Sequence, residues 1–95
     1  MAFGTIDLQA TGVADTHTFT GDNDLVISML MANKGTSLAE VTIMLRGQTL
    51  VKDSPLPVGS SFSYDGLKLA TFPSDVLSVV TNGEPVDVTV TTLIS

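Results

Sequence analysis

His17, the only histidine of the chain, is the first residue whose chemistry could support catalysis. Asp15 lies two residues before it, and a carboxylate that orients an imidazole is the arrangement of a general base. However, His17 stands in a threonine-rich extended stretch from Asp15 to Thr20, and the chain has neither a Gly-x-Ser-x-Gly elbow nor a Ser-x-x-Lys pair. We therefore expect a polar strand residue here, and a protein that is not an enzyme, with no catalytic residue and no small-molecule substrate.

The acidic segment Asp22-Asn23-Asp24 has the residue types that open a calcium-binding loop. Leu25 and Val26 then occupy positions where such a loop needs further ligands and a glycine. A turn capped by Asp and Asn side chains is the simpler interpretation. Gly59-Ser60-Ser61 lacks the lysine and the helix of a phosphate loop. We predict neither a metal site nor another cofactor.

The bulk composition excludes several classes of protein. Ten acidic residues against four basic ones give a formal charge of −6, and there is no cysteine for a disulfide or a thiolate metal site. The basic residues are scattered along the chain: Lys34, Arg46, Lys52 and Lys68. Nucleic-acid binding and attachment to anionic lipid both need clustered basic residues. The longest nearly apolar run, Leu25 to Ala32, is far shorter than the ~18 residues of a membrane-spanning helix. We therefore expect neither nucleic acid nor membrane as a partner.

The length of 95 residues and the low charged fraction point to a small subunit of an assembly. A chain of this length predicts one domain, because domains most often have ~100–150 residues. Charged residues make up 15% of the chain, below the ~25% that is usual for soluble proteins. A domain this small buries only ~60% of its unfolded surface. We therefore expect other subunits to cover part of it, as in a homo-oligomer.

Alternation of apolar and polar residues predicts strands through the first half of the chain. It is clear around Ile6, Leu8 and Ala10, and clearest from Ala39 to Arg46. Gly47 then gives a tight turn into Gln48 to Lys52, which predicts a hairpin. Leu25 to Ala32 is apolar on both faces, and its β-branched residues favour a central strand over a short helix. Methionines in and beside these strands are expected to fill the core.

Further strands are predicted in the second half, at Ser60 to Tyr64, Leu67 to Phe72, Val76 to Thr81 and Val86 to Ile94. Asp53 to Pro57 is expected to interrupt the ladder, because proline lacks the backbone donor of a central strand. Asn82-Gly83 between two β-rich runs predicts a hairpin. Phe62 and Phe72 lie within β segments and are expected to be core residues.

These seven or eight strands, separated by turn signals, predict an all-β fold. We expect a single antiparallel β-sandwich of the Ig-like kind over residues 1–95, with a small β-barrel as the alternative. Residues 1–4 precede the first alternating segment and are expected to form an N-terminal arm.

The order of several segments is similar to that of a known family. The segments are Met31-Ala32-Asn33, Val41 to Leu45, Leu50-Val51-Lys52, Pro55 to Ser61, Lys68-Leu69-Ala70, Pro73 to Val79 and Val86 to Val90. Over residues 25–95 this arrangement resembles the small Ig-like virion proteins of tailed bacteriophages. Ser74 stands where that family has a glycine before the aspartate of its Gly-Asp turn. The resemblance implies a structural protein of the virion, assembled in the host cytoplasm.

Within that family the resemblance implies a capsid decoration or cement protein, or a component of the neck or tail, that binds capsid or other virion proteins. A host-surface or carbohydrate-binding module of the same fold is the alternative, and it needs an exposed aromatic residue or a calcium site. Terminal arms and loops are the parts of small shell proteins that reach neighbours. The expected partner contacts are Met1, Ala2, Phe3, Gly4, Asn33, Lys34, Gly35, Pro55, Leu56 and Pro57.

Overall fold

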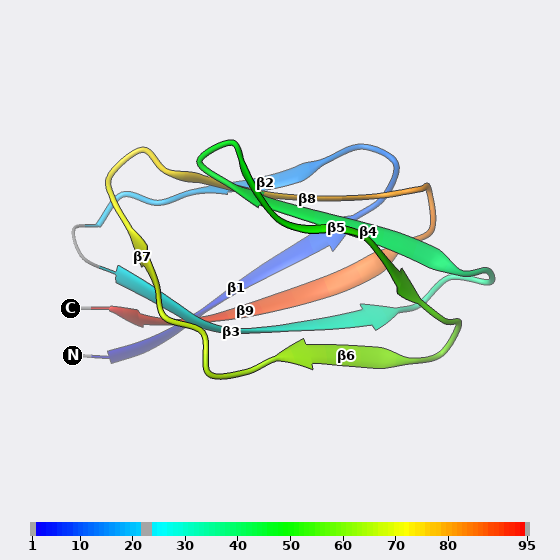
Figure 1. The fold of residues 1–95 in the computed structure, drawn as a ribbon. Helices are drawn as coiled ribbons and strands as arrows, with labels where there is room; N and C mark the ends of the chain where they lie inside the picture. Colours follow the sequence, from blue (N-terminus) through cyan, green and yellow to red (C-terminus); the bar gives the residue numbers. More distant parts are fainter. Residues whose placement is uncertain (1, 22–23, 95) are drawn as a thin grey trace.

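The computed structural model describes residues 2–21 and 24–94, which form nine strands and no helix. The strands are β1 (Ala2–Ala10), β2 (Asp15–Thr18), β3 (Asp24–Asn33), β4 (Ala39–Leu45), β5 (Gln48–Leu56), β6 (Ser61–Tyr64), β7 (Leu69–Thr71), β8 (Val76–Thr81) and β9 (Val86–Ile94). They build two antiparallel sheets packed face to face (Figure 1). Sheet A has the order β1-β9-β3-β6, with β7 also paired to β3, and sheet B has the order β2-β8-β4-β5. The described residues include no helix that could span a membrane.

The predicted β-sandwich is confirmed, and its strand order is that of a jelly roll. In the immunoglobulin order the first two strands are neighbours in one sheet. Here β1 and β2 belong to different sheets, and the chain changes sheet again from β2 to β3 and from β3 to β4. This alternation gives the interlocked Greek keys of a jelly roll. The chain therefore has jelly-roll connectivity and not the Ig-like connectivity expected from the sequence, although both arrangements pack two sheets around one core.

The structure has nine strands where seven or eight were predicted, and two of the predicted short strands, β6 and β7, lie along one broken edge of sheet A. Strand β7 pairs with Asp24–Val26 of β3, and β6 pairs with Met29–Ala32 of the same strand. Between them the Leu67 amide donates to the Ile27 carbonyl at 3.0 Å, where β3 also shifts register against β9. The two short strands thus share a single edge position.

The core follows the period of two that the sequence shows. Val86, Val88 and Val90 of β9 all point inward and are at most 1% exposed. In β3 the residues Met29 and Met31 are buried as well, which confirms the prediction of a central strand. Each such side chain contributes about 1.5–3 kcal/mol by leaving water. The methionines of β3 are core residues, as expected.

The two predicted hairpins have different outcomes. Strands β4 and β5 form one, and the turn residues Arg46 and Gly47 have φ of 54° and 76°, as a two-residue type I′ turn requires. The hairpin predicted at Asn82-Gly83 is wrong, because β8 lies in sheet B and β9 in sheet A. That turn crosses between the sheets, and Thr81 Oγ1 donates to the Glu84 carbonyl at 2.7 Å to hold it.

The segment Asp53 to Pro57 does not interrupt pairing as predicted, since β5 continues to Leu56. Strand β5 is the edge of sheet B, where the missing amide of Pro55 breaks no ladder. The irregularity is absorbed by register shifts against β4 and by a φ of 48° at Asp53.

The predicted N-terminal arm is a strand instead. Ala2, Phe3 and Gly4 belong to β1 and pair with Ile94, Leu93 and Thr92 of β9. This pairing satisfies backbone groups that a free arm would leave to water. Met1 lies outside the described residues.

Candidate binding surface

The structure does not orient Asp15 toward His17 as a general base requires. The Asp15 carboxylate accepts hydrogen bonds from the backbone amides of Gln9, at 2.9 Å, and Thr16, at 3.0 Å. The His17 ring lies edge-on against Phe19, with 4.9 Å between ring centroids. Asp15 therefore connects β2 to the edge of β1, and His17 packs beside the core.

The acidic segment at the start of β3 is described only in part, since Asp22 and Asn23 lie outside the described residues. The backbone carbonyl of Asp24 accepts a hydrogen bond from Thr71 Oγ1 at 3.1 Å, which ties β3 to β7. Among residues 2–21 and 24–94 no three His, Cys, Asp or Glu side chains are placed to hold a metal ion.

Asn33, one of the expected partner contacts, is a buried structural residue with 4% exposure. Its side-chain amide donates to the carbonyls of Ser37, at 2.9 Å, and Leu56, at 2.8 Å, and its Oδ1 accepts from the Gly35 amide at 2.8 Å. These three bonds shape the loop after β3 and fasten it to β5. A partner therefore cannot contact the Asn33 side chain, because the sandwich itself surrounds it.

The other expected contacts are divided between interior and surface. Leu56 is buried at 3% exposure, whereas Pro55 and Pro57 on either side of it are exposed. Lys34 forms an ion pair with Asp87 of β9, with 2.9 Å between Nζ and Oδ1. Phe3 is 75% exposed in β1. Of the expected residues, Phe3 presents the large apolar side chain on the surface.

Phe3 belongs to an apolar row that crosses the outer face of sheet A. The register places Phe3 of β1 opposite Leu93 of β9, Leu93 opposite Leu25 of β3, and Leu25 opposite Ala70 of β7. Residues directly opposite on neighbouring strands lie on the same face of a sheet and contact one another. Four strands from distant parts of the sequence thus build one apolar row.

The rest of this face consists mostly of uncharged residues. The next row is Thr5, Thr91 and Ser28, and beyond it Thr89 of β9 faces Leu30 of β3, which is 47% exposed. The charged groups of the face are Asp7 and the Asp87–Lys34 pair. In a chain of net charge −6 this near-neutral face is the surface best suited to bury against a partner. We call it the sheet A face.

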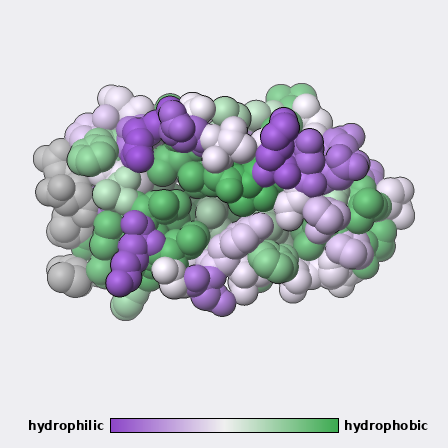
Figure 2. All heavy atoms as spheres, in the orientation of Figure 1, coloured by the Kyte–Doolittle hydropathy of each residue, from purple (hydrophilic) through white to green (hydrophobic). Residues whose placement is uncertain are grey.

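A second apolar region lies between the edges of the two sheets. Strands β5, β6 and β7 lie at the front of Figure 1, and Figure 2 shows hydrophobic side chains along the middle of this face between polar groups. The half-buried apolar residues of these edges are Leu50, Val51, Tyr64, Leu67 and Leu69. Phe62 is 49% exposed and meets Tyr64 edge-on, with centroids 4.8 Å apart.

The prediction that Phe62 and Phe72 belong to the core is therefore wrong, since Phe72 is also 52% exposed. Both lie on or beside the short strands of the broken edge, which no further strand covers. The sequence pattern marks them as strand residues but does not reveal that their strand is an edge.

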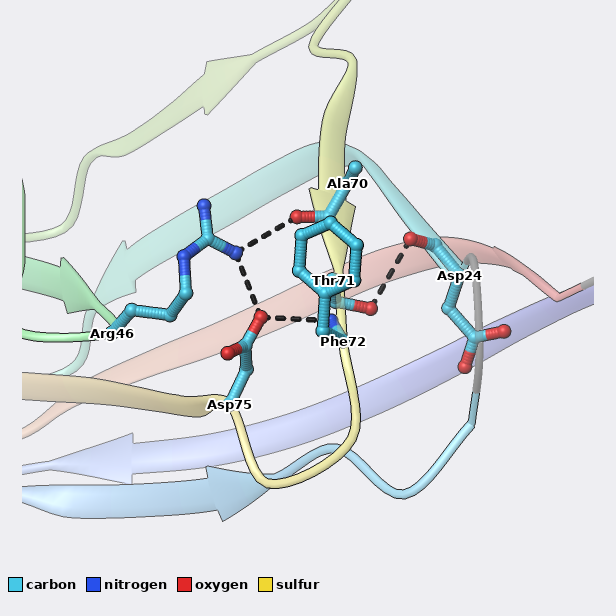
Figure 3. A network of polar contacts seen from close by, with 6 residues as sticks. All are labelled: Asp24, Arg46, Ala70, Thr71, Phe72 and Asp75. Carbon is cyan, nitrogen blue, oxygen red and sulfur yellow. Dashed lines mark hydrogen bonds and ion pairs between the residues drawn. The ribbon is translucent and has the colours of Figure 1, made fainter.

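A polar network fastens the turn before β8 to the β4–β5 turn (Figure 3). Arg46 Nη1 lies 2.7 Å from Asp75 Oδ2 and donates to the Ala70 carbonyl at 3.0 Å. The Phe72 amide also donates to Asp75 Oδ2, at 2.8 Å. Burial alone would raise the pKa of Asp75, but the hydrogen bonds from Arg46 and Phe72 and the Arg46 charge hold that pKa below its ordinary value. Arg46 and Asp75 both bond to backbone groups of the β7 region as well as to each other, so the network stabilises the fold.

Comparison with known proteins gives the fold and no family. No protein-family model and no curated protein matches the sequence. Among solved structures, the NLP core of Drosophila has a TM-score of 0.60 at 13% identity, with 94% of this chain and 97% of that chain covered. A Bacillus endospore appendage protein has a TM-score of 0.56 at 18% identity, with 96% and 82% covered.

A viral protein shares the fold as well. The VP2 subviral particle of infectious bursal disease virus has a TM-score of 0.52 at 12% identity, and the match covers 98% of this chain and 32% of that longer chain. At such identities the likeness shows a common β-sandwich fold and does not transfer a function.

Proposed function

We propose that this chain is a non-enzymatic structural protein of a tailed-phage virion, where it decorates the capsid as a cement protein. Its partners are then capsid or other virion proteins and further copies of itself. The resemblance of residues 25–95 to small virion proteins motivates the proposal. The observation that carries it is the sheet A face, where uncharged and apolar side chains are gathered in an otherwise acidic chain.

The chemistry of this face suits protein assembly better than turnover of a small molecule. Phe3, Leu93 and Leu25 form a continuous row, and apolar surface with threonine around it is suited to burial in a protein interface. The fold also occurs in proteins whose published structures concern pentamer formation, pili and a subviral particle. These likenesses support an assembly role as a proposal for this chain.

The test is the protein content of purified particles from the phage that encodes this chain. A stoichiometric band at 9.9 kDa is expected, together with saturable binding of purified protein to particles that lack it. Particles without the band would overturn the proposal. The Phe3→Ser variant should bind less, whereas Val13→Ser, at an equally exposed apolar residue outside the apolar row, should bind normally.

Copy number separates decoration from a role in the neck or tail. A decoration protein occurs in many copies spread over the capsid, while a neck or tail component forms a single small ring at one vertex. Quantitative mass spectrometry of the particle against the major capsid protein distinguishes these two locations.

A host-surface carbohydrate-binding module is the second candidate, and the exposed Phe62 beside Tyr64 favours it. Aromatic faces at a surface can stack on sugar rings. A glycan array with the purified protein tests this function, with Phe62→Ala as the variant and Val58→Ala, 52% exposed, as the matched control. An array without signal removes this candidate and leaves the structural role standing.

A further inference from the structure

The outer edge of β1 carries backbone groups that the sandwich leaves free. In an antiparallel strand, successive residues direct their N–H and C=O groups alternately to one side and to the other. The Gln9 amide donates to Asp15 Oδ2, away from β9, so the same side of β1 carries the groups of Phe3, Thr5 and Asp7. Asp15 closes this edge at Gln9, and residues 3–7 form its open part.

The other described sheet edges are protected against pairing and β1 is not. Strand β5 has a bulge at Asp53, the charged Lys52 and Pro55, which are features that block edge-to-edge association. The other edge strands are β2, β6 and β7, with four, four and three residues. By contrast, β1 has nine residues, neither lysine nor proline, and one charge, at Asp7.

The open part of β1 fits a second copy of this chain, because one strand edge can pair antiparallel with the same edge of another copy. Two copies that each carry a charge of −6 repel one another except where both present neutral surface. The open part of β1 carries a single charge, at Asp7, and it adjoins the apolar row of Phe3 and Leu93. We propose that β1 pairs antiparallel with β1 of a second copy about a two-fold axis, which joins two A sheets into one.

The open part of the edge also sets the register of this pairing. A strand that pairs antiparallel with itself over residues 3–7 has its axis at Thr5, so Thr5 faces the second copy's Thr5. Phe3 then faces the second copy's Asp7, which keeps the two Asp7 carboxylates apart. A register centred on Asp7 would place like charges directly opposite, and this is destabilising.

The inner side of the edge has room for the second copy. In this register the second copy's Ile6 lies opposite Gly4. Beside Gly4 is a cavity of about 250 Å³. It is lined by the apolar side chains of Ile6, Phe19 and Ile94 together with polar groups of Thr5, His17, Thr20, Asp24 and Thr92. An added strand places alternate side chains on the inner side, so the apolar groups of this cavity can receive that Ile6. The inner face of the strand therefore offers apolar contacts to the second copy.

Disulfide trapping in the purified protein tests the register, because the natural chain has no cysteine. Paired residues across such an axis have Cα atoms about 5.5 Å apart, within disulfide range. Thr5→Cys is expected to form a covalent dimer at least about tenfold faster than Thr49→Cys, an exposed control on the β5 edge, since pairing raises the local thiol concentration. A mixture of Phe3→Cys and Asp7→Cys should form the mixed dimer. Equal rates for Thr5→Cys and Thr49→Cys would overturn the proposal.

A backbone substitution tests the edge pairing independently. Thr5→Pro removes the free amide of the edge without touching a bond to β9, so it should abolish dimers in sedimentation velocity, whereas Thr5→Val should keep them. Unchanged dimers in a folded Thr5→Pro protein would contradict the edge pairing.

This inference deepens the proposed assembly role, but its tests need no phage particle. Failure of disulfide trapping with a stoichiometric band in particles refutes only the edge pairing. Trapping at Thr5 without such a band refutes only the location in the virion.

Discussion

Arg46 and Asp75 form an ion pair of 2.7 Å between the turn that joins β4 to β5 and the turn that precedes β8. Arg46 has a φ of 54°, a conformation that Asn or Gly adopts more readily in a type I′ turn. The guanidinium also lies over the Phe72 ring, 5.7 Å from its centroid. The ion pair therefore fastens two distant turns together, and it involves a residue whose backbone conformation is unfavourable.

Replacing Asp75 by Asn should lower the melting temperature at neutral pH and reduce its dependence on acid. The folded-state pKa of Asp75 is below its ordinary value, so this carboxylate stabilises the fold above that ordinary value. The contribution is lost as the pH falls through the folded-state pKa. Calorimetry of both proteins across the acidic range measures the effect, and their melting temperatures should converge at low pH. Asp65→Asn is the control, because its exposed carboxylate accepts only from Ser63 Oγ among the described contacts. Parallel curves for Asp75→Asn and the natural protein would contradict the prediction.

Replacing Ser74 by Gly should stabilise the protein by about 0.5–1 kcal/mol. Ser74 has a φ of 74°, which costs a residue with a side chain about 1–2 kcal/mol, and the greater freedom of glycine in the unfolded chain offsets part of the gain. Chemical denaturation measures the change. Ser74→Ala retains the unfavourable conformation and should show no gain. A destabilised Ser74→Gly protein would mean that the serine makes a contribution its backbone conformation does not reveal.

Strands were predictable from the sequence where alternation is strong, and sheet membership was not. The bounds of β8 and β9 agree with the predicted Val76 to Thr81 and Val86 to Ile94. The Asn82-Gly83 turn between them has the local chemistry of a hairpin, yet Gly83 has a φ of 120° and the chain crosses to the other sheet. Which strands pair depends on contacts distant in sequence, and the residues of the Asn82-Gly83 turn do not reveal them.

The candidate surface was predictable only in part, because it too depends on which strands are neighbours. Phe3 was expected to contact partners, and the structure places it on the surface in strand β1. Leu93, Leu25 and Ala70 were not expected beside it, since only the register of β9, β3 and β7 brings them into one row. Conversely, Asn33 was expected to contact partners because it begins a loop, and its burial follows from a bond to Leu56 of β5, 23 residues away.

Replacing Asn33 by Ala should destabilise the protein by about 1–3 kcal/mol, because the buried Leu56 carbonyl and the half-buried Gly35 amide lose their partner. Urea denaturation measures the loss. Asn82→Ala is the matched control. The Asn82 amide donates to the Leu38 carbonyl and its Oδ1 accepts from the Glu40 amide, both at 3.2 Å, but these bonds are exposed and water can replace them. Equal losses for the two variants would contradict the structural role of Asn33.

Replacing Phe3 by Ser should weaken assembly without weakening the fold. Phe3 is 75% exposed, so the free energy of unfolding should change by no more than about 0.5 kcal/mol. An aromatic residue that is buried by a partner contributes about 1.4 kcal/mol or more, so self-association should weaken at least about tenfold. Sedimentation velocity over a concentration series measures it, with melting temperature as the check on folding. Val13→Ser removes a side chain that is 78% exposed but lies between β1 and β2, outside the apolar row, and it should associate as the natural protein does. If both variants associate normally, Phe3 takes no part in the surface through which copies of this chain meet.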